Sequence, residues 1–380
     1  MTRSRLTSAL FAVLALLCTL ACVDPKPGDT GTTPLYVYDN TSHQVLAWDD
    51  VNAIADLAAD STAPSAARVI KADVITNLGT LAWGGMVLNP STNSLYLISE
   101  TGSVVRINNA GTQNGTLTST TDVVTFTLGN TSSDRLSSSV FSQAAIDTST
   151  GTLYVLETGS SNAWRIWIVN NPAGIGSGGI AAAGSYLDST ITQDTGGAAI
   201  ATAGSGNLIG FFRSGSTVPD TLGVLNSGPR LRLSSGASFQ YNTQVLVGAS
   251  ALLWDGSTTP AYASLAYDTT FNRLYVARPI ASGNAVLAVN QGQFTVGNMN
   301  QAPYAVMPDT AAALAGLRLI AHARVKDWMV GADFTSSTTT TGTGSNLLRV
   351  WKGPSSKTAS VRYYLATGVE IRGLALDGSK

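Results

Sequence analysis

Cysteine, histidine and charge are all scarce in this chain of 380 residues. Charged residues make up 12% of the sequence, the formal net charge is −1, and no basic stripe is present, which argues against a nucleic-acid partner. The only cysteines are Cys18 and Cys22, so cleavage after Ala21 would leave no possible internal disulfide. Long runs with helical apolar spacing are also missing. The abundant Gly, Ser, Thr and Asn, with Val and Leu alternating with polar residues, are typical of an all-β fold rich in turns.

The N-terminus has the pattern of an export signal. Two arginines precede an apolar run from Ala9 to Leu17, which is too short for a membrane span of about 20 residues. The following Thr19-Leu20-Ala21-Cys22 resembles a bacterial lipobox, although its first two residues depart from the usual pattern. We expect residues 1–21 to be a lipoprotein signal peptide and Cys22 to carry the lipid. The protein would then be exported and anchored to the bacterial cell envelope, at the outer membrane. A plain secretory signal is the alternative.

The segment after this signal predicts a spacer and then a single domain. Residues 22–33 contain two Pro and two Gly without an apolar pattern, which indicates a flexible tether. By length alone, residues 34–380 could form two average domains. A repeated phrase in this part of the sequence favours one closed domain instead.

The phrase recurs about every 57 residues and consists of an apolar run, a polar residue, a turn, and then Leu-Tyr-Val or a similar triplet. In the copies that include the triplet, the polar residue lies six positions before the Leu or Trp that begins it. Periods of this size are typical of repeat architectures. The polar residues of the successive copies are Asn89, Asp147, Thr202, Asp268, His322 and Asp377.

One copy of the phrase is split between the two ends of the chain. The sequence stops shortly after Asp377, before a triplet, whereas Leu35-Tyr36-Val37 near the N-terminus has no apolar run ahead of it. The two halves predict a ring in which the C-terminal strand completes the N-terminal sheet. Radial repetition of small sheets is a β-propeller. We therefore predict an all-β, six-bladed β-propeller with four-stranded antiparallel blades.

With these motifs the chain resembles six-bladed propellers of the NHL-type and TolB-like group, in which an inner strand ends in Asp before a turn and Leu-Tyr-Val. The resemblance covers nearly all of residues 35–380. It implies the fold more than the function, because such propellers serve as enzymes, receptors and scaffolds. Some are calcium-dependent lactonases with carboxylates and Asn around the axis. Here Glu100 and Glu157 end second strands, where solvated edge positions are expected, so lactonase-like hydrolysis at the central channel is an alternative function.

The repeated polar residues and two inner-strand arginines are the other candidates for chemistry. Asp or Asn before a hairpin turn hydrogen-bonds its own turn backbone, so we expect structural roles at the rim, too far apart to share one metal ion. Arg318 and Arg372 could hold an anion with Gln143 if both point into the channel mouth. Otherwise they would pair outwards with loop carboxylates.

Tryptophans on or beside third strands are expected to fill the space between blades, whereas exposed ones would suggest a sugar-stacking surface. They include Trp48, Trp164, Trp167 and Trp351. Nothing in the sequence assigns a catalytic residue, a metal or a cofactor. We therefore expect a binding or interaction module whose partner is a protein or a glycan, with a structural envelope scaffold as a further alternative.

Overall fold

The computed structural model describes residues 32–129, 135–159, 164–181, 186–189, 194–204, 207–214, 221–225, 238–239, 245–247, 264–280, 283–290, 305–306, 309, 316–323, 327–333, 346–366 and 368–377. Thr33–Ser379 form one compact unit, whose fold is described below. The expected signal peptide and Cys22 lie outside the described residues. Within the described ranges, no helix has the length and apolar character needed to cross a membrane.

The Leu-Tyr-Val phrase forms a strand whose two faces are both buried. In β1 (Leu35–Asp39), Leu35 and Val37 belong to one hydrophobic cluster, while Tyr36 and Tyr38 belong to another. Successive side chains of a strand point to opposite faces, so a strand packed between two neighbouring sheets is apolar at consecutive positions. The core of the protein accordingly lies between the sheets.

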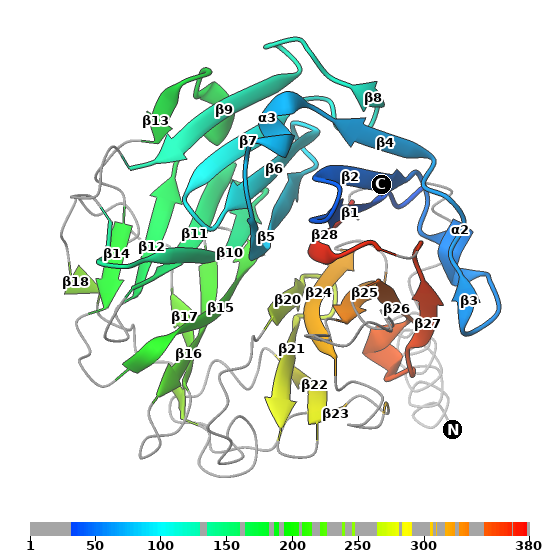
Figure 1. The fold of residues 1–380 in the computed structure, drawn as a ribbon. Helices are drawn as coiled ribbons and strands as arrows, with labels where there is room; N and C mark the ends of the chain where they lie inside the picture. Colours follow the sequence, from blue (N-terminus) through cyan, green and yellow to red (C-terminus); the bar gives the residue numbers. More distant parts are fainter. Residues whose placement is uncertain are drawn as a thin grey trace, which may run out of the picture. The chain divides into compact units, whose positions relative to one another are not determined.

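The strands of the described ranges form six sheets (Figure 1). The first contains, in spatial order, β28 (Ile371–Leu376), β1, β2 (Gln44–Trp48), β4 (Arg68–Lys71) and β8 (Gly115–Thr116). The second contains β5 (Leu81–Asn89), β6 (Ser94–Ser99), β7 (Ser103–Ile107), β9 (Val123–Leu128) and β13 (Gly179–Ala181). The third contains β10 (Val140–Asp147), β11 (Thr152–Thr158), β12 (Trp164–Val169), β14 (Tyr186–Ser189) and β18 (Ser238–Phe239).

The strands of the remaining three sheets are given in the same way, in their spatial order from the inner strand outwards. The fourth contains β15 (Asp194–Gly204), β16 (Asn207–Ser214), β17 (Thr221–Leu225) and β19 (Val245–Val247). The fifth contains β20 (Ser264–Asp268), β21 (Arg273–Ile280), β22 (Gly283–Asn290) and β23 (Ala305–Val306). The sixth contains β24 (Leu317–Ala323), β25 (Trp328–Asp333), β26 (Leu347–Lys352), β27 (Val361–Tyr364) and β3 (Ser61–Thr62). Among the described residues, the short helices are α2 (Asn52–Ala55), α3 (Asp73–Thr76), η2 (Pro172–Gly174) and η4 (Pro354–Ser356).

The first strands of the six sheets contact one another in a closed cycle. From β28 the contacts run through β5, β10, β15, β20 and β24 and return to β28 (Figure 1). The fold is a β-propeller. Antiparallel pairing of β1 with β28 places Val37 opposite Leu374, so the C-terminal strand completes the sheet that the N-terminal segment begins. The split copy of the repeat predicted this closure, and the register confirms it.

Crowding at the inner strands explains two of their glycines, one facing a neighbouring inner strand and one facing the second strand of its own sheet. A Cβ on Gly373 of β28 would lie 2.7 Å from the Cβ of Met86 on β5. A Cβ on Gly85 would lie 2.6 Å from the carbonyl oxygen of Ile98. Both distances are below van der Waals contact, so the small residues predicted at the crowded inner positions are required at these two sites.

The prediction of four-stranded, wholly antiparallel sheets is wrong for four of the six. The extra strands β3, β8, β13 and β18 each pair in parallel with the outermost strand of the preceding sheet in chain order, with β3 closing the cycle onto the sixth sheet. Each comes from the connection between the third and fourth strands of the sheet that follows the one it joins, with the first sheet following the sixth. Because these strands span only two or three residues, they carry no recognisable alternation in the sequence. They link neighbouring sheets at their outer edges.

Candidate functional site

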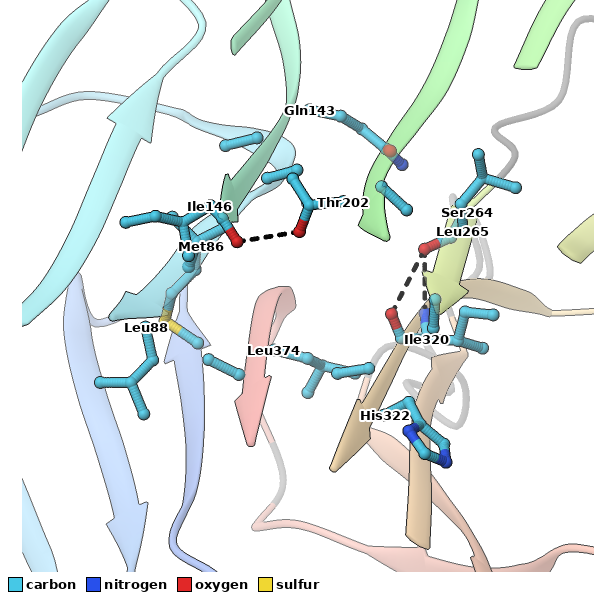
Figure 2. Close-up of a pocket in the computed structure, with 18 of the residues that line it drawn as sticks. Met86, Leu88, Gln143, Ile146, Thr202, Ser264, Leu265, Ile320, His322 and Leu374 are labelled. Carbon is cyan, nitrogen blue, oxygen red and sulfur yellow. Dashed lines mark hydrogen bonds between the residues drawn. The ribbon is translucent and has the colours of Figure 1, made fainter. Parts of the chain in front are cut away.

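Some backbone groups of the inner strands form hydrogen bonds with side chains of a neighbouring inner strand. The Ser264 hydroxyl on β20 accepts a hydrogen bond from the Ile320 amide at 3.1 Å and donates to the Ile320 carbonyl at 3.5 Å. The Thr202 hydroxyl donates to the Ile146 carbonyl at 2.9 Å. Figure 2 shows both contacts beside the central cavity. They satisfy backbone groups at strand edges that have no neighbouring strand to pair with.

Residues from all six inner strands line a cavity of about 170 Å³. Most of the lining is apolar, and its polar side chains are those of Gln143, Thr148, Thr202, Ser264, Tyr267 and His322. Among the described lining residues there is no carboxylate, lysine or arginine. A cavity of this composition favours a small, neutral and largely apolar group held by a few hydrogen bonds.

Gln143 is the one predicted anion contact that reaches this cavity. Its Oε1 accepts a hydrogen bond from the Ile200 amide on the neighbouring strand at 3.2 Å. Arg372 Nη1 lies 2.9 Å from Glu100 Oε1, and Arg372 Nε lies 2.9 Å from Glu370 Oε1. Neither Arg318 nor Arg372 is among the described lining residues of the cavity. The three-residue anion site stays a prediction.

The repeated polar residue has the expected turn role in three copies. Asn89 Oδ1 accepts from the Ser91 amide at 3.1 Å, and Asp147 Oδ1 accepts from the Ser149 amide at 2.9 Å. Asp268 Oδ1 accepts from the amides of Thr270 and Phe271. The turn interpretation is confirmed for these three residues.

Two of these positions nevertheless lie close together, contrary to the expected separation. His322 Nε2 at the end of β24 lies 3.6 Å from Asp268 Oδ2 at the end of β20 and 3.9 Å from Asp327 Oδ1. One ligand atom of each residue lies within 4.8 Å of the others. The side chains of His322 and Asp268 are 1% and 0% exposed, while that of Asp327 is 24% exposed. Adjacent inner strands converge at this point, which brings successive copies of the repeat into contact.

The surroundings of this cluster are both aromatic and charged. The His322 ring stacks on Tyr275 with centroids 5.5 Å apart and an interplanar angle of 23°. Burial raises the pKa of Tyr275, and the negative charges of Asp327 and Asp268 raise it further. Burial by itself would raise the pKa of Asp327, but the polar contacts with His322 and Ser355 outweigh burial and hold it below its ordinary value.

Asp327 escaped the sequence prediction. It precedes β25 in the same hairpin as His322, and it lies in the copy whose usual turn Asp has become His. An acidic residue introduced five positions after that His was the available signal. This signal indicates a cluster only when the structure shows that Asp268 of the neighbouring strand also lies beside His322.

The position of Glu157 differs from the sequence prediction, whereas three of the tryptophans lie where they were predicted. Glu157 is buried, where a solvated edge position was expected; its carboxylate accepts from Trp167 Nε1 at 2.7 Å and from the Leu136 amide at 3.0 Å. Trp48, Trp167 and Trp351 are buried, as predicted for side chains between sheets, whereas the Trp164 side chain lies outside the described set. These three tryptophans therefore provide no sugar-stacking surface.

No protein-family model and no curated protein matches the chain. Among solved structures, a chain of the nidogen/laminin complex is similar over 90% of this chain and 98% of its own length, with 10% identity and a TM-score of 0.48. Hydrazine synthase from Kuenenia stuttgartiensis is similar over 72% of this chain and 64% of its own length, with 10% identity and a TM-score of 0.37. Values this low support no statement about function.

Proposed function

We propose that this protein is an exported, lipid-anchored binding module of the bacterial cell envelope, built as a six-bladed β-propeller of the NHL-type or TolB-like kind. Cys22 would carry the lipid and residues 22–33 would separate the propeller from the outer membrane. Six sheets with contacting inner strands support the blade count. The lipobox-like tetrad, which ends in the lone remaining cysteine, supports the anchor.

The central cavity is the observation that carries the binding role. It gathers side chains from all six inner strands around one space, and its polar groups are hydroxyls, an amide and an imidazole. Sites of this kind fix a ligand by shape and a few hydrogen bonds. The partner would be a protein segment or a glycan that inserts an uncharged group at the cavity mouth.

A calcium-dependent hydrolase at the cavity is less well supported. Calcium takes six to eight oxygen ligands, typically including carboxylates. The described residues that line the cavity supply no carboxylate. A scaffold without a ligand remains the other alternative, and it predicts that nothing enters the cavity.

Site-specific photo-cross-linking in the producing cells separates these possibilities. A photoreactive phenylalanine would replace Thr148, which lines the cavity, and in a control variant Ser65, which is exposed on a connection outside it. The binding role predicts a discrete adduct from position 148 and none from position 65. Equal labelling at both positions, or none at either, would contradict the proposal and favour a scaffold.

The anchor needs a separate experiment. Membrane fractionation and mass spectrometry of the full chain should find acylated Cys22 in the outer membrane, and Cys22→Ser should move the protein to the soluble fraction after signal cleavage. A Cys22→Ser protein that is cleaved yet stays in the membrane fraction would refute lipid anchoring. This result does not depend on whether the cavity binds a partner.

A further inference from the structure

We infer that Asp268, His322 and Asp327 bind a divalent cation of the zinc or manganese class and thereby join the fifth and sixth sheets. One imidazole nitrogen and two carboxylate oxygens, all within 4.8 Å of one another, provide the mixed N/O donor set that these metals accept. Asp268 comes from β20, whereas His322 and Asp327 come from the β24–β25 hairpin. A cation at this position would therefore bridge two sheets whose described strands share no backbone ladder.

The buried polar atoms of this cluster point independently to a ligand. Neither ring nitrogen of His322 has a hydrogen-bond partner among the described residues, and the same holds for Asp268 Oδ2. Both side chains are almost fully buried. A buried polar atom without a partner is costly, because folding removes its hydrogen bonds to water. A metal ion would satisfy both His322 Nε2 and Asp268 Oδ2.

Hydrogen bonds from neighbouring turns hold the two carboxylates in place. The turn amides of Thr270 and Phe271 use Oδ1 of Asp268, so its Oδ2 is directed towards His322. The Ser355 amide donates to Asp327 Oδ1 at 3.1 Å, and the Ser355 hydroxyl donates to Oδ2. Second-sphere hydrogen bonds of this kind orient metal-ligating carboxylates.

The spacing of the donors fits coordination better than a direct ion pair. His322 Nε2 lies 3.6 Å and 3.9 Å from the two carboxylate oxygens, beyond hydrogen-bond length. Ligands about 2.0–2.2 Å from a common zinc ion are separated by distances of this order. Two carboxylates with a neutral imidazole also carry the charge that a divalent cation neutralises. Three protein ligands leave a position for water or for a group of a bound partner.

The test uses the full chain, extracted in detergent, treated with a chelator and titrated separately with Zn²⁺, Mn²⁺ and Ca²⁺ by calorimetry. We expect one Zn²⁺ or Mn²⁺ per chain, with Ca²⁺ weaker because a nitrogen ligand disfavours it. Asp268→Asn keeps the Oδ1 acceptor of the turn, and His322→Gln removes the imidazole. Each should weaken cation affinity by about tenfold or more. Visible spectra of the Co²⁺-loaded protein should change in His322→Gln if the imidazole is a ligand.

Asp147→Asn is the matched control. Asp147 occupies the same position of the repeat and makes the same turn hydrogen bond, but Thr202 stands where the next copy would need His322. This variant should bind the cation as the unmodified protein does. The inference fails if no cation binds, or if Asp268→Asn and His322→Gln leave binding unchanged. It also fails if none of the three metals changes the stability of the chelator-treated protein.

Discussion

The hydroxyl of Ser264 should stabilise the junction between β20 and β24 measurably. Its Oγ accepts from the Ile320 amide at 3.1 Å and donates weakly to the Ile320 carbonyl at 3.5 Å (Figure 2). Ser264→Ala removes both contacts while adding no bulk. Ser264→Thr keeps a hydroxyl at the same position. Comparing its stability with that of Ser264→Ala therefore isolates the contribution of the hydrogen bonds.

The expected loss of stability depends on which hydrogen-bond acceptor replaces the Ser264 hydroxyl at the Ile320 amide. A buried donor left without a partner costs about 1–3 kcal/mol. Here the cavity of about 170 Å³ lies beside it and exceeds the roughly 10–15 Å³ that one water needs. A water that replaces the hydroxyl would lower the cost, so we expect Ser264→Ala to reduce the free energy of unfolding by about 1–2 kcal/mol.

Urea unfolding followed by circular dichroism measures this loss as a shift of the midpoint at constant m-value. Ser65→Ala on the exposed surface is the control, and it should change stability by less than about 0.5 kcal/mol. Ser264→Thr should fall closer to the unmodified protein than Ser264→Ala. If Ser264→Ala matched the control, the side-chain contacts between inner strands would not hold the ring together, and the reasoning would be refuted.

Three further predictions concern the packing between and within sheets. Arg349→Leu should lower the free energy of unfolding in urea by about 3–5 kcal/mol, because it removes the guanidinium that bonds the buried Asp333 carboxylate at 2.7 and 2.6 Å. The double variant Arg349→Leu with Asp333→Leu should recover most of this loss. Gly373→Ala should cost roughly 1–3 kcal/mol, since its Cβ would lie 2.7 Å from a neighbouring one, and an unchanged melting temperature would contradict this. Burial raises the pKa of Tyr38 and Tyr154 to about 12, so their contribution to stability is complete below pH about 10 and is lost as pH rises through about 12. Tyrosinate absorbance should therefore appear together with unfolding.

The fold was largely predictable because the sheets are buried on both faces. Each inner strand and its partner read as consecutive apolar residues ended by a polar turn residue, as in Ala145-Ile146-Asp147 and Leu153-Tyr154-Val155. That signal is local, and the split copy around Leu35 and Asp377 added the one long-range pairing. The hidden parts were contacts with no local pattern: the short parallel strands at the outer edges, and the burial of Glu157 against Trp167.

The candidate cation site was hidden for a different reason, because it depends on a pair of successive copies. At Asp268 the turn amides use Oδ1, and Oδ2 is directed towards the residue that the next inner strand presents. After Asp147 the next copy presents Thr202, whose hydroxyl donates to a backbone carbonyl. After Asp268 it presents His322. A residue that is structural in each copy taken alone can thus become a ligand at one junction, and the departures from a repeat indicate chemistry only when they are compared between neighbouring copies.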